Sequence, residues 1–204
     1  MSGRPGRALR RGRPYTAGRG PDMTRGVLVA GIGNLFLGDD GFGPEVVRRL
    51  AAGPGPPLPA GVRITDYGIR GMHLAYDLLD GYDALVLVDA YPGGGPPGEL
   101  TVLEIGPDDL GTGEFDAHGM NPVAMLANLD QLGGTLPLTH LVGCTPAGVD
   151  EGIGLSEAVA AAVPRAVAAV RTLLHRLPMA GPPPSATPLP DPALASAPDR
   201  PRRS

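Results

Sequence analysis

Apolar residues along this chain fall into short runs of two kinds, separated by turn-forming residues. Nearly continuous runs are typical of strands buried on both faces of a sheet, and apolar residues recurring every three or four positions are typical of helices. The predicted strands are Val27–Ile32, Val62–Tyr67, Ala84–Asp89, Glu99–Ile105 and Thr139–Cys144. The predicted helices are Pro44–Ala52, Met72–Leu79, Asn121–Leu132 and Ser156–Leu177.

Local signals support these boundaries and define the fold class. Pro44 suits the first turn of a helix, Gly81 is a helix stop, and Ser156 is a candidate N-cap. The loop Tyr91–Gly98 is too short for a helical crossover, so the strand after it is predicted to run antiparallel to its neighbours. The order of elements predicts an α/β protein, a three-layer α/β/α sandwich whose five-stranded sheet is mostly parallel with one antiparallel strand.

Composition divides the chain into a central domain and two flanking segments. Residues 1–22 are basic and rich in Gly and Pro, and they are predicted to be a disordered arm or to precede the true start at Met23. Residues 23–177 are predicted to be a single α/β domain, and residues 178–204 a disordered Pro/Ala-rich tail.

Charge narrows the class of partner. The central domain holds 8 Arg against 18 acidic residues, a net charge of −10. This argues against nucleic acid and suits a cation, or a partner that presents positive charge. The apolar runs are shorter than the ~20 residues of a membrane span, and no secretory signal is recognisable. With Cys144 as the only cysteine, no internal disulfide forms, and a cytoplasmic protein is expected.

Three places in the sequence carry four side chains of candidate chemistry. Asp39 and Asp40 follow the first strand, Asp89 ends the strand at Ala84–Asp89, and His118 precedes a predicted helix. The carboxyl ends of parallel strands share one edge of a sheet, so the first two places are predicted to converge there. The Gly-rich loop Gly111–Phe115 can return His118 to the same edge. Two carboxylates and an imidazole suit a divalent metal such as Ni or Zn, or the activation of a water molecule.

Each of these residues can instead have a purely structural role. Asp39 or Asp40 can cap the helix that Pro44 begins, with Asp39 the better candidate for that role. Asp89 can be a turn residue and His118 a cap or packing residue. Cys144 is interpreted as a buried small residue rather than a nucleophile. The glycines at 31, 33 and 38 lack the spacing of a phosphate-binding loop, so they are interpreted as sites of tight turning and close backbone approach.

Taken together, these residues resemble the hydrogenase maturation protease family, whose members remove a C-terminal extension from the large-subunit precursor of nickel-iron hydrogenase. The resemblance runs from about Val27 to Leu174. It is carried, in order, by GIGNLFLGDDGFGPEVV, DYGIRGMHL, LVLVDA, AHGMNP and LVGCTPAGVDEGIGLSEAV.

The resemblance implies roles for individual residues. Asp40, Asp89 and His118 match the positions that contact metal in this family, and Asp40 and Asp89 are the catalytic candidates. Some members have Glu at the Asp40 position, which changes its reach by one methylene. The loop Gly68, Ile69, Arg70 and Gly71 resembles one thought to receive substrate, with Arg70 a candidate for specificity.

The implied activity is an endopeptidase that acts after nickel insertion, with nickel supplied by the precursor rather than held permanently. Whether an Asp-activated water or nickel itself drives hydrolysis, so that the enzyme is aspartic-type or metal-assisted, stays open. A non-catalytic nickel-sensing or assembly module on the same fold is the alternative.

Overall fold

The protein is described here by a computed structural model covering residues 26–177 except 54, 107–108, 110–125 and 127–128. The predicted arm at 1–22 and tail at 178–204 therefore lie outside the described residues, as does His118. The described elements, in chain order, are β1 (Val27–Ile32), the short 3-10 helix η1 (Gly38–Gly41), α1 (Phe42–Ala52), β2 (Val62–Gly68), α2 (Gly71–Leu79), β3 (Ala84–Ala90), β4 (Leu100–Ile105), β5 (Leu138–Cys144) and α4 (Glu157–Arg176).

The five strands form one sheet in the order β2-β1-β3-β5-β4. Neighbouring strands pair in parallel except β4, which runs antiparallel to β5. The predicted sheet is therefore confirmed. The short connection after β3 explains the exception, because it cannot carry the chain back to the start of the sheet.

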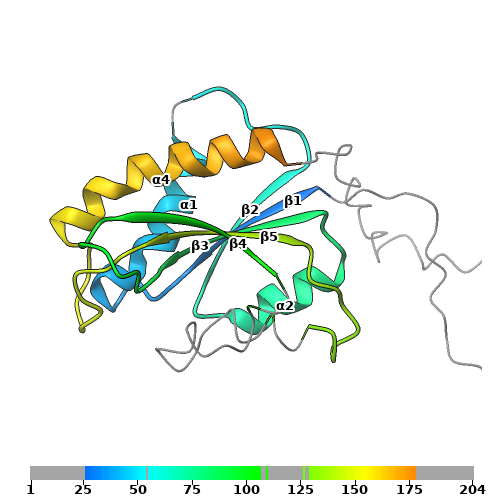
Figure 1. The fold of residues 1–204 in the computed structure, drawn as a ribbon, viewed down its shortest axis with the longest axis horizontal. Helices are drawn as coiled ribbons and strands as arrows, with labels where there is room; N and C mark the ends of the chain where they lie inside the picture. The colour runs from blue at the N-terminus through cyan, green and yellow to red at the C-terminus, as the bar shows by residue number, and fades with distance from the viewer. Residues whose placement is uncertain (1–25, 54, 107–108, 110–125, 127–128, 178–204) are drawn as a thin grey trace, which may run out of the picture.

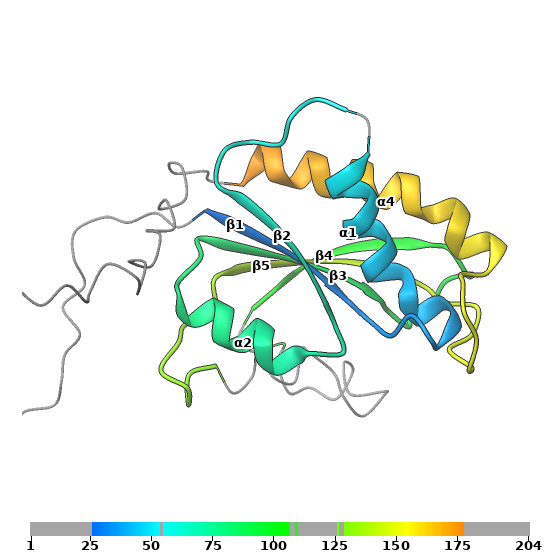
Figure 2. The same ribbon diagram turned by 180° about the vertical axis from the view of Figure 1, so that it is seen from behind.

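Helices cover both faces of the sheet, with α1 and α4 packed together on one face and α2 on the other (Figures 1 and 2). All six residues of β1 are buried, as are the first five of β3, which explains why their sequences read as continuous apolar runs. The core on the side of α1 and α4 is completed by helix residues at three- and four-residue spacings, among them Val159, Val163 and Ala166.

Helix α4 has the length and apolarity of a possible membrane span, which the short apolar runs did not suggest. Its apolar stripe, however, belongs to the core of the domain: Val159, Val163, Val170 and Leu174 have no exposed surface. Arg165 donates a hydrogen bond to the carbonyl of Gly98 at 2.8 Å. These contacts are those of a core helix packed on the sheet.

Helix ends follow the predicted signals, with one exception. Ser156 is the N-cap of α4, and its side chain accepts a hydrogen bond from the Val159 amide. Gly81 follows α2 with φ of 80°, a left-handed conformation that glycine adopts without strain. The helix predicted over Asn121–Leu132 lies mostly outside the described residues, but its predicted end is wrong, because residues 129–133 form turns closed by the Gly133 and Gly134 amides.

Candidate functional site

The order of strands creates a switch point between β1 and β3. From β1 the chain passes through α1 to β2 on one side, and then returns through α2 to β3 on the other side. The loops that leave β1 and β3 at their carboxyl ends therefore diverge, and open α/β sheets bind ligands in the crevice so formed. Asp40 lies in the first of these loops and Asp89 lies at the end of β3.

Two glycines fit the acidic loop against the strand ends. Gly33 has φ of 127°, and a Cβ atom at this position would collide with the carbonyl oxygen of Asp40. A Cβ atom on Gly43 would collide with the carbonyl oxygens of Ile32 and Val88, which are the last buried residues of two adjacent strands. The glycines thus allow close approach of the chain's own backbone, and this brings the start of α1 directly onto the ends of β1 and β3.

Asp40 and Asp89 come together as predicted. The Asp40 carboxylate accepts a hydrogen bond of 2.6 Å from the Asn34 amide, which fixes its direction. Burial, and after it the negative charge of Asp40, raise the pKa of Asp89 to about 8, although a backbone hydrogen bond from Ala90 acts in the opposite direction. Two carboxylates that repel each other at a switch point suit a cation or a shared proton.

Asp39 differs completely from its neighbour, with an exposed fraction of only 2%. One carboxylate oxygen accepts from the Ser156 amide at 2.6 Å, and the other from the Ala147 amide at 2.7 Å and the Ser156 hydroxyl at 2.9 Å. The expected structural role is thus confirmed, but capping of α1 is wrong: the N-cap of α1 is Gly41, without a side-chain bond. Asp39 instead ties its loop to the start of α4.

The loop after β2 adjoins the site. The Gly33 amide donates to the carbonyl of Gly68 at 3.1 Å, so this loop lies beside the turn that carries Asp40. Arg70 folds back and donates to the carbonyl oxygens of Tyr67 and Asp66 at 3.1 and 2.9 Å. Ile69 is left more than half exposed. Arg70 therefore stabilises the shape of the loop. The apolar side chain that the loop exposes to solvent is that of Ile69.

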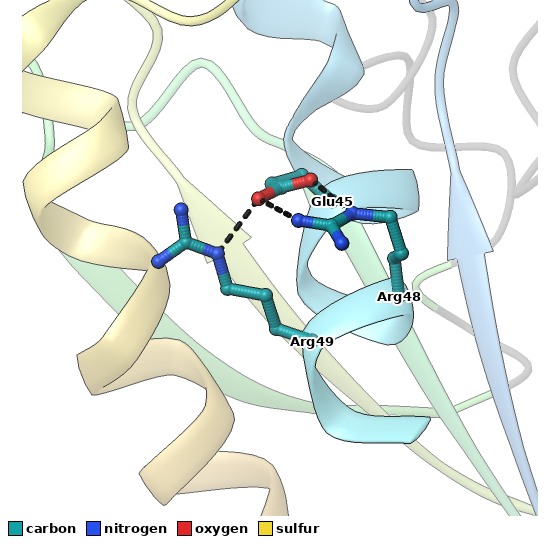
Figure 3. Close-up of polar contacts among 3 residues, drawn as sticks. All are labelled: Glu45, Arg48 and Arg49. Carbon is teal, nitrogen blue, oxygen red and sulfur yellow. Dashed lines mark hydrogen bonds and ion pairs between the residues drawn. The ribbon is translucent and has the colours of Figure 1, made fainter. Parts of the chain in front are cut away.

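Other reactive or charged side chains of the described residues are held in structural contacts. Burial raises the pKa of the Cys144 thiol to about 11, with a contribution from the nearby Asp39 carboxylate, which suits an unreactive core residue. His140 lies within β5, where its Nε2 atom is 3.9 Å from Glu104. Figure 3 shows Glu45 between two arginines of α1. Arg48 and Arg49 each approach the Glu45 carboxylate to 2.7 Å. The hydrogen bond from Arg48 is the main cause of the lowered pKa of Glu45.

Within the described part of the chain, no group of three His, Cys, Asp or Glu side chains is arranged to hold a metal ion. Asp40 and Asp89 supply two carboxylates, and the third predicted ligand, His118, lies outside the described residues. The fold and site thus define an α/β protein with a paired-carboxylate site at the switch point of its sheet.

Comparison with known proteins identifies the family. The family model described as hydrogenase maturation protease matches residues 44–173. A hydrogenase expression/formation protein, HupD of Rhodobacter capsulatus, is 34% identical over 151 residues, covering 72% of this chain and 70% of HupD. The chain belongs to the hydrogenase maturation protease family.

Solved structures agree with this assignment. The hydrogenase maturating endopeptidase HybD from Escherichia coli has a TM-score of 0.64 at 28% identity, covering 74% of this chain and 93% of HybD. The NiFe hydrogenase maturation protease HycI from Thermococcus kodakarensis has a TM-score of 0.59 at 25% identity, over 74% and 93% of the two chains. Sequence and fold therefore point to the same class of peptidase.

Proposed function

We propose that this protein is an endopeptidase that removes the C-terminal extension of a nickel-iron hydrogenase large-subunit precursor after nickel insertion. One observation carries the proposal: in a chain of the maturation protease family, Asp40 and Asp89 come together at the switch point of the sheet. Membership of the family supports the peptidase activity, and the acidic pair supports the recognition of a cation.

In the proposed reaction, nickel arrives as part of the substrate. Asp40 and Asp89 approach the cation from the two strand ends, and His118 is proposed as the third ligand. The cation relieves the repulsion that otherwise disfavours two ionised carboxylates at this place. A precursor without nickel leaves that repulsion in place, so that the acidic pair distinguishes loaded precursor from unloaded.

For hydrolysis we propose carboxylate assistance. A carboxylate of the pair accepts a proton from the attacking water, the water oxygen adds to the scissile carbonyl, and the protonated carboxyl returns a proton to the leaving amine as the C–N bond breaks. The loop Gly68–Gly71 is proposed to receive the substrate backbone, with Ile69 as its exposed apolar contact. We propose that the reaction takes place in the cytoplasm.

The deciding experiment incubates the purified protein with nickel-loaded precursor and measures the mass of the large subunit. We expect the wild type to remove a C-terminal fragment, and Asp89→Asn to slow removal by about 100-fold or more, because Asn keeps the shape but loses the charge and the base. Asp80→Asn is the control, since Asp80 is exposed at the end of α2, away from the carboxyl ends of the strands, and it should cleave like the wild type.

Two outcomes argue against the proposal. An unchanged subunit mass with wild-type protein would instead support the non-catalytic nickel-sensing module. Full processing by a folded Asp89→Asn variant would remove Asp89 from the reaction.

A further inference from the structure

The loops before α1 and before α4 are joined into one surface, here called the two-loop rim (Asn34–Asp40 and Ala147–Leu155). The Gly38 amide donates to the carbonyl of Gly152, and the Gly152 amide donates to that of Phe36, both at 2.9 Å. A third backbone bond of 3.2 Å joins the Asp39 amide to Gly148. In both ribbon views, these loops lie side by side at the same end of the molecule (Figures 1 and 2).

The two-loop rim presents large apolar side chains to solvent. Leu35 is 52% exposed, Phe36 67% and Ile153 84%, although the backbone around them is held by several hydrogen bonds. The backbone bond from Gly152, directly before Ile153, to Phe36 places Phe36 and Ile153 near each other on the rim. A fixed backbone means that a partner binding here pays little entropy to order it.

Charge on the two-loop rim specifies the partner further. Its two segments contain Asp39, Asp40, Asp150 and Glu151 and no Arg. The Asp39 carboxylate is used internally, whereas Asp150 and Glu151 are exposed beside Ile153. The complementary surface is therefore an apolar segment flanked by basic residues. Because Asp40 belongs to the same rim, a segment bound there lies next to the acidic pair.

We propose that the two-loop rim is the docking surface for the substrate protein, with Phe36 and Ile153 contacting an apolar, basic stretch of polypeptide close to the bound cation. This inference rests on the proposed function and adds specificity residues to it. The contacts form in the ground state and persist through the reaction, so their loss raises KM and leaves kcat unchanged.

The test compares a Phe36→Ser/Ile153→Ser double variant with Val102→Ser in the processing assay. Val102 is 46% exposed on the edge strand β4, outside the rim, so it controls for loss of an exposed apolar side chain. We expect the double variant to raise KM about tenfold or more at unchanged kcat, and Val102→Ser to match the wild type. An Asp150→Asn/Glu151→Gln variant is expected to raise KM at low salt only.

Several results would overturn the inference. If the wild type cleaves normally and the double variant has an unchanged KM, the inference is wrong. It is also wrong if the double variant lowers kcat alone. Sedimentation showing a wild-type dimer that the double variant abolishes would assign the rim to a second copy of this chain. If the wild type itself cleaves no precursor, the proposed function fails instead. Should the double variant not fold, Phe36→Ser and Ile153→Ser are tested singly.

Discussion

At the scale of single residues, two adjacent and chemically identical side chains have different surroundings. Asp39 is buried and accepts hydrogen bonds from residues more than a hundred positions away, whereas the negative charge of Asp40 acts on Asp89 at the switch point. The sequence was sufficient to predict a structural role for Asp39, and the role of Asp40 in the site stays a prediction. It could not identify the partners of Asp39, because Ala147 and Ser156 are brought to it only by the tertiary fold.

Asp89 should make stability depend on pH. Its folded pKa is raised from 3.8 to about 8, so the folded state holds a proton that the unfolded state releases. The stabilisation from neutral Asp89 is complete below about pH 4 and is lost as the pH rises to about 8. We expect the wild type, free of metal, to lose unfolding free energy relative to Asp89→Asn across this window. Urea denaturation of both proteins at pH 5 and pH 8.5 measures the difference.

A wild type that follows Asp89→Asn in parallel across this range would contradict the raised pKa. Asp80→Asn serves as the control, because replacing an exposed carboxylate should not change the pH dependence appreciably.

Gly33→Ala should disrupt the site more than the fold. The new methyl group would collide with the carbonyl of Asp40 and occupy a left-handed backbone, at a cost of about 1–3 kcal/mol. Relief requires Asp40 to move, so we expect processing to fall at least tenfold at a temperature where the variant is still folded. Gly94→Ala is the matched control, because a Cβ atom there meets nothing within 4 Å. Normal processing by Gly33→Ala would show that Asp40 tolerates displacement.

At the scale of elements, the strands could be predicted from sequence because each is an apolar run with clear boundaries. The β1 and β3 runs are buried on both faces, and Ser156 and Gly81 mark helix ends through local chemistry. The sequence failed where several turn signals overlap: turns that begin at Leu129 and Asp130, before the predicted helix end at Leu132, are closed by the amides of Gly133 and Gly134. The pairing of β1 with β3 depends on long-range packing, which no local pattern encodes.

The burial of α4 predicts a large effect of truncating its core side chains. Leu174 has no exposed surface, so Leu174→Ala should lower the unfolding free energy by about 2–5 kcal/mol. Leu79→Ala removes the same atoms from a residue that is 39% exposed and should cost clearly less. Chemical denaturation of the three proteins compares them. Equal stability of Leu174→Ala and the wild type would contradict the packing of α4 as a core helix.

At the scale of the whole molecule, the proposed complex has the acidic body and the apolar rim acting on the same partner at different ranges. A net charge of −10 over residues 23–177 attracts a cationic partner from a distance, whereas Phe36 and Ile153 act only on contact. Long-range attraction affects the rate of encounter more than the lifetime of the complex.

Processing should therefore weaken with salt. We expect kcat/KM to fall several-fold as ionic strength rises from about 0.05 to about 0.5 M, because screening shortens the reach of the acidic surface. The Phe36→Ser/Ile153→Ser variant should show the same salt slope from a lower starting value, since it loses contact area and no charge. Rates measured along a salt series test both expectations, and a kcat/KM independent of salt would contradict electrostatic steering.

The hydrogen bonds from Ala147 and Ser156 to the Asp39 carboxylate also have a consequence for biosynthesis. Asp39 is made early, but Ser156 and the start of α4 leave the ribosome more than a hundred residues later. Before Ser156 has been synthesised, the loop that carries Asp40 lacks the hydrogen bonds to Asp39 that hold it against the loop before α4. A growing chain therefore cannot complete its acidic site before α4 has been synthesised, and the proposed cleavage of a partner becomes possible only then.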